Sequence, residues 1–198
     1  MNQTVLHDLI ELYHDDEQTR AKLAQVGVLF DGYAAEMEQV HKQNAEQLDA
    51  IIGEFGWPGE SLVGEDGTWL AWMIAQRAIS LPDFQRRCLD LLNAAVANED
   101  APAVHAAYMT DRIRFNERKP QVYGTVFDWD EYGQLNPWRI EDEANVDERR
   151  ASVGLPPLVD AVEEARNQAV VEGNTAPADY RARQWEIEEW ARKVGWTE

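Results

Sequence analysis

The segment TWLAWMIAQRAI, residues 68 to 79, constrains the fold more than any other stretch of the chain. Its side chains are apolar nearly all the way round a helix, which is typical of a helix buried in the middle of a bundle. Its longest apolar run covers residues 69 to 75, far short of the roughly 20 residues that a membrane-spanning helix needs. The segment therefore predicts a central helix with other helices packed around it.

Apolar residues recur at intervals of three and four over much of the remaining chain, which is the spacing of helices with one buried face. Gly56 and Pro58 end one such pattern, and Pro82 suits the first turn of another. Residues 57 to 67 contain three Gly and one Pro, so they are predicted to form a loop, after which Thr68 caps the central helix. The other predicted helices cover residues 4 to 26, 33 to 55, 82 to 97, 102 to 114, 157 to 171 and 177 to 194.

The pattern changes between residues 121 and 140. Residues that favour strands, among them Val126 and Phe127, precede the turn sequence DEYGQ, and Leu135 begins a second apolar stretch in which Pro137 permits only an edge strand. We therefore predict a short β-hairpin or extended segment here. Together these patterns predict a mainly α, single-domain bundle over residues 1 to 198, with about seven helices.

The chain carries 37 acidic and 18 basic residues, a formal net charge of -19. Such a surface repels the phosphates of nucleic acids and of anionic membranes, so neither is expected as a partner. The single cysteine, Cys88, can form no internal disulfide, which fits a reducing cytoplasm. The N-terminal residues lack the basic start and apolar run of a signal peptide, so a cytoplasmic location is expected.

The motifs that would indicate a metal or a cofactor are missing from the sequence. The four histidines, at positions 7, 14, 41 and 105, are too scattered to place ligands on one helical face. Neither a glycine-rich phosphate loop nor a nucleophile elbow occurs. We therefore expect no metal and no cofactor.

A carboxylate stands where the helical pattern predicts an apolar side chain. Asp111 lies three residues after Tyr108, on a face of the helix predicted from residue 102 that is otherwise apolar. Because a buried carboxylate needs hydrogen bonds or a cation, we expect Asp111 to be buried and bonded to Arg77, to Arg112 or to residues 121 to 125.

Other polar residues also stand at positions where an apolar side chain is expected. The sequence predicts no catalytic residue. The candidate ligand-binding residues are Gln76, Arg77, Gln85, Asp111, Arg112, Gln121, Tyr123 and Thr125. Two interpretations are open. These residues either form a buried polar network that fixes the register of the helices, or line a pocket that orients a small polar or anionic ligand.

Five short motifs occur in a recognisable order: FGWPGESLVG, WMIAQRAISLPDFQ, YMTDRI, QVYGT and VDERRASVGLPPL. Together they resemble a bacterial family of unknown function marked by GWP, QHAxxxxPxFQ, TDR, QxYGT and RxxVGL, over residues 44 to 160. The resemblance implies a shared fold and a shared set of polar positions, but no reaction. The matching positions are Trp57, Pro58, Gln76, Pro82, Phe84, Gln85, Asp111, Arg112, Gln121, Tyr123, Gly124, Thr125, Arg149, Gly154 and Leu155.

One position departs from the family pattern, because Arg77 stands where the family usually has His. If that His is a general base, this chain has lost the activity, and if it only donates a hydrogen bond, Arg77 can replace it.

Two classes of function fit these observations. The first is a small-molecule-binding protein or a metal-independent enzyme of unknown reaction. The alternative is an acidic protein-interaction module, similar to an immunity protein or an antitoxin, which binds a protein partner or a second copy of the chain. A cavity containing Arg77, Asp111 and Gln121 would favour the first, and a filled core with an exposed patch rich in Trp would favour the second.

Overall fold

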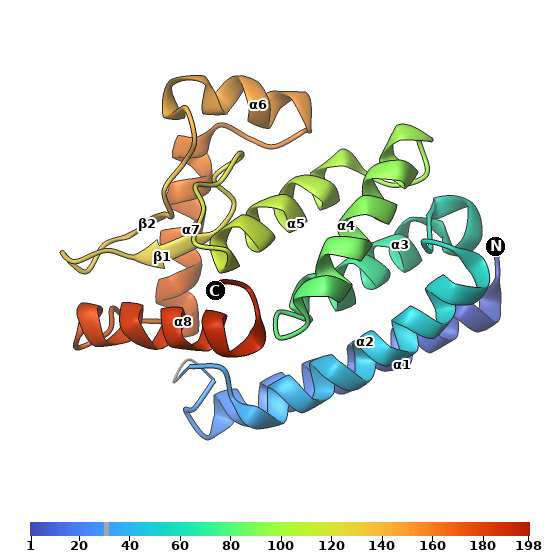
Figure 1. The fold of residues 1–198 in the computed structure, drawn as a ribbon, viewed down its shortest axis with the longest axis horizontal. Helices are drawn as coiled ribbons and strands as arrows, with labels where there is room; N and C mark the ends of the chain where they lie inside the picture. Colours follow the sequence, from blue (N-terminus) through green and yellow to red (C-terminus); the bar gives the residue numbers. More distant parts are fainter. Residues whose placement is uncertain (30–31) are drawn as a thin grey trace. The chain divides into compact units, whose positions relative to one another are not determined.

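The structure is a computed structural model that describes residues 1–29 and 32–198 (Figure 1). The described residues form eight α-helices, one short 3-10 helix and one two-stranded sheet, which confirms the mainly α prediction. Contacts divide the chain into two compact units, residues 1–106 and 107–198. The prediction of a single domain stays a prediction.

The first unit contains four helices and the start of a fifth. They are α1 (Gln3–Gln25), α2 (Ala35–Phe55), α3 (Glu60–Arg77), α4 (Pro82–Ala97) and α5 (Ala103–Asn116). Helices α1 and α2 run alongside each other and α3 packs against both (Figure 1), with Leu9, Leu48 and Ala75 fully buried among them. Asn2 caps α1 through its side chain, and Pro82 occupies the first turn of α4. The predicted helices in this part of the chain are confirmed.

The predicted loop at residues 57 to 67 is wrong, because α3 already begins at Glu60. Its first turn is capped by Asp100, whose side chain accepts hydrogen bonds from the Ser61 amide at 2.6 Å and the Ser61 hydroxyl at 3.0 Å. Gly64 has a φ of 75°, which is not helical, so the first turn is offset from the rest of the helix.

Thr68 lies inside α3 instead of capping it. Its hydroxyl donates to the Pro58 carbonyl at 2.8 Å and is fully buried. This hydrogen bond ties the middle of the apolar helix to the Gly-Trp-Pro turn, and the segment predicted to be central is confirmed as largely buried from Leu70 to Gln76.

The second unit contains the predicted hairpin. Strands β1 (Phe127–Trp129) and β2 (Leu135–Pro137) pair antiparallel, with Asp128 opposite Asn136. The turn between them contains Gly133, whose φ is 72°. The hairpin is confirmed, with three residues on each side. Before Phe127 the backbone pairing continues through the Val126 carbonyl, which accepts the Trp138 amide at 2.9 Å, and through a bridge between Gln121 and Ile140.

One 3-10 helix and three α-helices follow the hairpin (Figure 1). A short 3-10 helix (Glu143–Asn145) leads into α6 (Val146–Ser152), and then come α7 (Leu158–Glu172) and α8 (Tyr180–Val194). The two long helices confirm the prediction, whereas α6 was missed because its seven residues are too few to show a helical period. Among the described residues, no helix combines the length and apolarity that crossing a membrane requires.

Candidate functional site

Asp111 is fully buried and bonded to the segment that follows α5. Its carboxylate accepts hydrogen bonds from the amides of Val122 at 2.7 Å, Tyr123 at 3.1 Å and Thr125 at 2.9 Å, and from the Thr125 hydroxyl at 3.0 Å. The expected burial and bonding of Asp111 are thus confirmed, with backbone amides in place of an arginine. Gly124 allows the tight turn, because its φ is 68° and a Cβ there would lie 2.7 Å from Ile140.

Gln121 closes the same turn from within. Its amide nitrogen donates to the carbonyls of Val126 and Trp138, both at 2.9 Å, and its amide oxygen accepts from the Val126 amide at 2.6 Å. All three bonds are made by a side chain with no exposed surface. The Gln121 side chain therefore bonds to backbone groups on both sides of the hairpin and fixes the position where it starts.

Two arginines from α6 donate hydrogen bonds to the carbonyl groups of this turn. Arg149 donates to the Val122 carbonyl at 2.8 Å, and Arg150, which is buried, donates to the Tyr123 carbonyl at 2.7 Å and the Pro156 carbonyl at 2.6 Å. Asp111 thus accepts from the backbone amides of the turn, and the two arginines donate to its carbonyls. These bonds hold the backbone of the turn in place, as expected of a structural network.

Gln85 has a similar role in the first unit. It has no exposed surface, and its amide nitrogen donates to the carbonyls of Ala75 at 2.7 Å and Gln76 at 2.9 Å. These carbonyls belong to the last turn of α3, where the Ala75 carbonyl also accepts the Ala78 amide at 3.3 Å. The Gln85 side chain therefore holds the end of α3 against α4 through the backbone of Ala75 and Gln76.

Arg77, at the position where the family pattern usually has His, joins α3 to α1. Its guanidinium donates to Asp16 at 2.9 Å and to Glu17 at 2.8 Å. Although burial acts against the charged form, the two carboxylates raise the pKa of Arg77 above its ordinary value. Arg77 is thus a partner of α1 and not of Asp111.

A cluster that the sequence analysis missed surrounds Asp16. His41 of α2 places Nε2 3.3 Å from the carboxylate of Asp16, and Nδ1 of His41 lies 2.7 Å from the hydroxyl of Tyr33. Burial alone would raise the pKa of Asp16, but the contacts with His41 and Arg77 outweigh it and lower the pKa.

The sequence did contain a signal for this cluster. Asp16 lies four residues after Leu12 and His41 four after Met37, so each polar side chain occupies an apolar helix face, as Asp111 does.

Arg112 differs from every residue above. It is half-buried on α5, and none of the described residues accepts a hydrogen bond from its guanidinium or pairs with its charge. Burial lowers the pKa of Arg112 below its ordinary value. One turn further along, the amide nitrogen of the buried Asn116 also has no acceptor within the described part of the chain.

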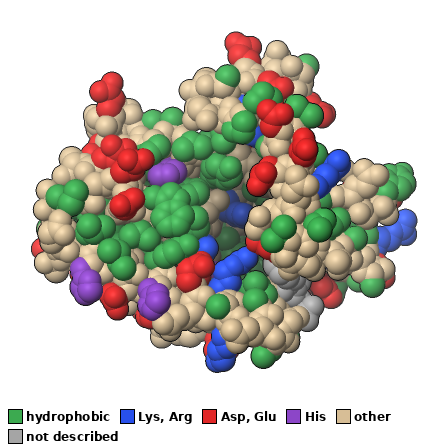
Figure 2. Space-filling model, turned by 180° about the vertical axis from the view of Figure 1, so that it is seen from behind, with side chains coloured by type: hydrophobic (Ala, Val, Ile, Leu, Met, Phe, Trp, Pro, Cys, Tyr) green, Lys and Arg blue, Asp and Glu red, His purple; other side chains and the backbone are tan. Residues whose placement is uncertain are grey.

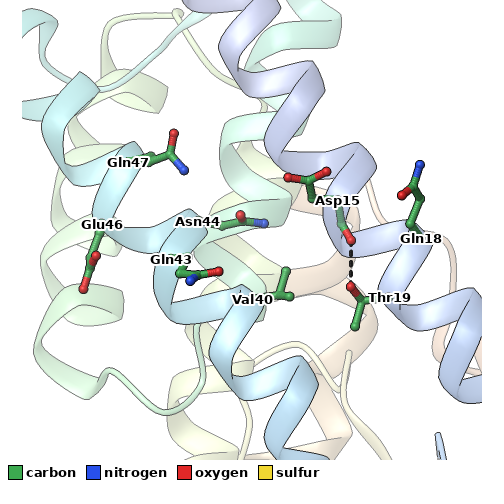
Figure 3. Close-up of a pocket in the computed structure, with 8 residues that line it drawn as sticks. All are labelled: Asp15, Gln18, Thr19, Val40, Gln43, Asn44, Glu46 and Gln47. Carbon is green, nitrogen blue, oxygen red and sulfur yellow. Dashed lines mark hydrogen bonds between the residues drawn. The ribbon is translucent and has the colours of Figure 1, made fainter.

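The first unit has a groove on its surface. This groove of about 420 Å³ runs between α1 and α2 and is lined by Asp15, Gln18, Thr19, Val40, Gln43, Asn44, Glu46 and Gln47 (Figure 3). Asn44 bridges the two helices by donating to the Leu12 carbonyl at 2.8 Å. No predicted site residue lines this groove, and its two charged side chains are acidic, so it is poorly suited to an anion.

The chain matches a family model described as a family of unknown function, DUF6624, over residues 5–170. The chain belongs to the DUF6624 family. The resemblance to a family of unknown function is thereby confirmed at that level. No curated protein and no solved structure matches the chain.

In this DUF6624 member the predicted site residues divide clearly. Asp111, Gln121, Tyr123 and Thr125 meet in one turn of the second unit, whereas in the first unit Gln85 binds the backbone of Gln76 and Arg77 joins α3 to α1. Arg112 is the candidate residue for which the described chain provides no partner.

Metal and thiol chemistry have no visible basis in the described residues. No group of three or more His, Cys, Asp or Glu side chains lies close enough together there to hold a metal ion. Burial raises the pKa of the Cys88 thiol to about 12, so at neutral pH this cysteine is an unreactive core residue.

Proposed function

We propose that this protein binds a small anion bearing a carboxylate or phosphate group, and that Arg112 is the residue that holds it. The supporting observation is a half-buried guanidinium with no counter-charge in the described chain, in a protein whose net charge is -19. A guanidinium removed from water without a partner is unfavourable, and an anion would remove that penalty. The proposal names no reaction.

The neighbouring donor supports an oxyanion as the ligand. Arg112 and Asn116 are four residues apart on α5 and so share one face of the helix. The planar guanidinium presents parallel N–H groups that match two oxygens of a carboxylate or phosphate. The Asn116 amide would add a further hydrogen bond from the same face.

The proposal is tested by titrating the protein with inorganic phosphate and with acetate at constant ionic strength while following its thermal unfolding. Binding to the folded state should raise the Tm, because a ligand at ten times its Kd contributes about 1.4 kcal/mol. Arg112→Met should abolish this response and, without ligand, should leave stability unchanged or higher by about 1 kcal/mol, because it removes an unpaired charge.

Arg181→Met is the matched control, since Arg181 is an exposed arginine of the same unit with no partner in the described chain. It should keep the full response. Equal responses from the wild type and Arg112→Met would refute the proposal, as would a wild type that responds to neither anion.

An acidic protein-interaction module is the second candidate. The observation in its favour is exposed apolar surface on the first unit, where Ile10 is 45% and Trp69 36% exposed. Figure 2 shows a face on which hydrophobic side chains gather, with acidic side chains at the margin. A wild-type Tm that changes with neither phosphate nor acetate would favour this candidate.

A further inference from the structure

Four side chains from different parts of the first unit meet in one cluster. Asp16 comes from α1, His41 from α2 and Arg77 from α3, while Tyr33 precedes α2. We propose that Tyr33 is a reactive tyrosine, that His41 is the base that accepts its phenolic proton, and that Asp16 is the positioning residue for His41. The proposal is independent of anion binding at Arg112.

The tautomer of His41 follows from its two neighbours. The Asp16 carboxylate is ionised, since its contacts with His41 and Arg77 lower its pKa despite burial, and an ionised carboxylate can only accept hydrogen bonds. The ring nitrogen facing it, Nε2 at 3.3 Å, must therefore carry the proton. Nδ1 is left as an acceptor, and the Tyr33 hydroxyl at 2.7 Å is the donor.

Nε2 of His41 faces the Asp16 carboxylate at 3.3 Å without the geometry of a hydrogen bond, so the effect of this contact is electrostatic. An imidazolium formed when His41 accepts the phenolic proton would face the negative charge of Asp16 across this distance. Arg77 holds the carboxylate in place from the other side at 2.9 Å.

Tyr33 cannot react as a resident phenolate. Burial is the largest cause that raises its pKa, and the carboxylates of Glu38 and Asp16 raise it further, while the Ser80 hydroxyl acts in the opposite direction. The phenol is therefore protonated at neutral pH. Its oxygen can become a nucleophile only if the proton moves to His41 as the new bond forms.

The step is a group transfer to oxygen. The Tyr33 oxygen forms a bond to an electrophilic carbonyl carbon, the bond from that carbon to its leaving group breaks, and the phenolic proton passes to His41 Nδ1. The leaving group departs with the bonding electron pair. Asp16, Glu17 and Glu38 outnumber Arg77 around the site, so an uncharged acyl donor suits it better than a phosphoryl donor.

The probe is p-nitrophenyl acetate, an uncharged acyl donor whose leaving group absorbs light. The full chain is treated at neutral pH, and acetylation of each tyrosine is timed by peptide mass spectrometry. Tyr132 is the internal reference, because it is 81% exposed and its hydroxyl has no partner in the described chain. Tyr33 should be acetylated roughly 100-fold faster than Tyr132, the scale of general-base assistance.

Two variants separate activation from simple exposure. His41→Phe keeps an aromatic ring against Tyr33, whose ring centroid lies 5.7 Å from that of His41, but removes the base, so the rate at Tyr33 should fall to that at Tyr132. His105→Phe replaces a histidine outside the cluster and should leave the rate at Tyr33 unchanged. Tyr33 reacting no faster than Tyr132 in the wild type would overturn the proposal, and so would an unaltered rate in folded His41→Phe.

A measurement on the wild type keeps the test decisive if His41→Phe does not fold. Nitrogen-15 chemical shifts of His41 at neutral pH should show a protonated Nε2 and an unprotonated Nδ1. The opposite tautomer would contradict the proposed direction of proton transfer. The anion titration of Arg112 is unaffected by either outcome.

Discussion

His105 stacks flat on Trp72, with ring centroids 4.5 Å apart and an angle of 4° between the planes. Burial lowers the pKa of His105 from its ordinary 6.5 to about 4. Between these values the unfolded chain binds a proton that the folded chain does not, so stability is present above pH 6.5 and is lost as the pH falls toward 4. The loss should be about 2 to 3 kcal/mol, and His105→Phe should remove it from urea unfolding curves recorded across this range.

The comparison with a second histidine separates this effect from the general loss of carboxylate charge in acid. His7→Gln changes an exposed histidine, so its curve should follow that of the wild type at every pH. A His105→Phe variant as acid-sensitive as the wild type would show that His105 titrates normally.

Asp111 presents the other residue-scale test. Asp111→Asn keeps the shape but turns an amide group toward backbone N–H donors that the carboxylate now accepts, so it should cost about 2 to 4 kcal/mol of unfolding free energy in urea. Asp83→Asn is the control and should cost no more than about 0.5 kcal/mol, because this fully exposed side chain makes only a surface pair with Arg86. Arg77→Met should not compensate, because Arg77 bonds to Asp16 and Glu17, and a recovery in the double variant would contradict the geometry.

At the scale of elements, the start of α3 depends on a residue 39 positions further along the chain. Asp100 accepts the Ser61 amide and hydroxyl, and its backbone carbonyl accepts the Glu60 amide at 2.9 Å. Asp100→Ala should therefore destabilise the protein by about 1 to 2 kcal/mol, the range for losing an N-terminal cap. Asp90→Ala on exposed α4 surface is the matched change, and equal effects from the two would disprove the capping role.

This cap also explains why the start of α3 could not be predicted from the sequence. Helix periods, Pro82 and Gly56 predict most helices because their causes are local. The cap of α3 comes from the α4–α5 connection, so residues 57 to 67 show only their Gly and Pro content. Likewise, the apolar stripe predicted that Asp111 is buried, but only the folded chain determines that its partners are backbone amides.

At the scale of the whole molecule, charge is the property that the sequence determines most directly, and the size of the net charge makes salt a stabiliser. The excess of 37 acidic over 18 basic residues leaves a net charge of -19, whose self-repulsion opposes the compact state. Surface pairs such as Lys22 with Glu36 lose strength in salt, but each such pair contributes only about 0 to 1 kcal/mol. The stabilisation from screening the excess negative charge should therefore exceed the stability lost from the weakened ion pairs.

Raising sodium chloride from about 10 to about 100 mM shortens the screening length from about 30 to about 10 Å, which weakens repulsion between distant carboxylates. We expect the Tm measured by circular dichroism to rise by about 2 to 4 °C, the equivalent of about 1 kcal/mol in a chain of this size. Arg112→Met separates the two ways in which salt can act. A gain that persists in this variant comes from the whole surface, whereas a gain that disappears comes from chloride held at Arg112. A Tm that falls as salt is added would show that the ion pairs outweigh the net charge.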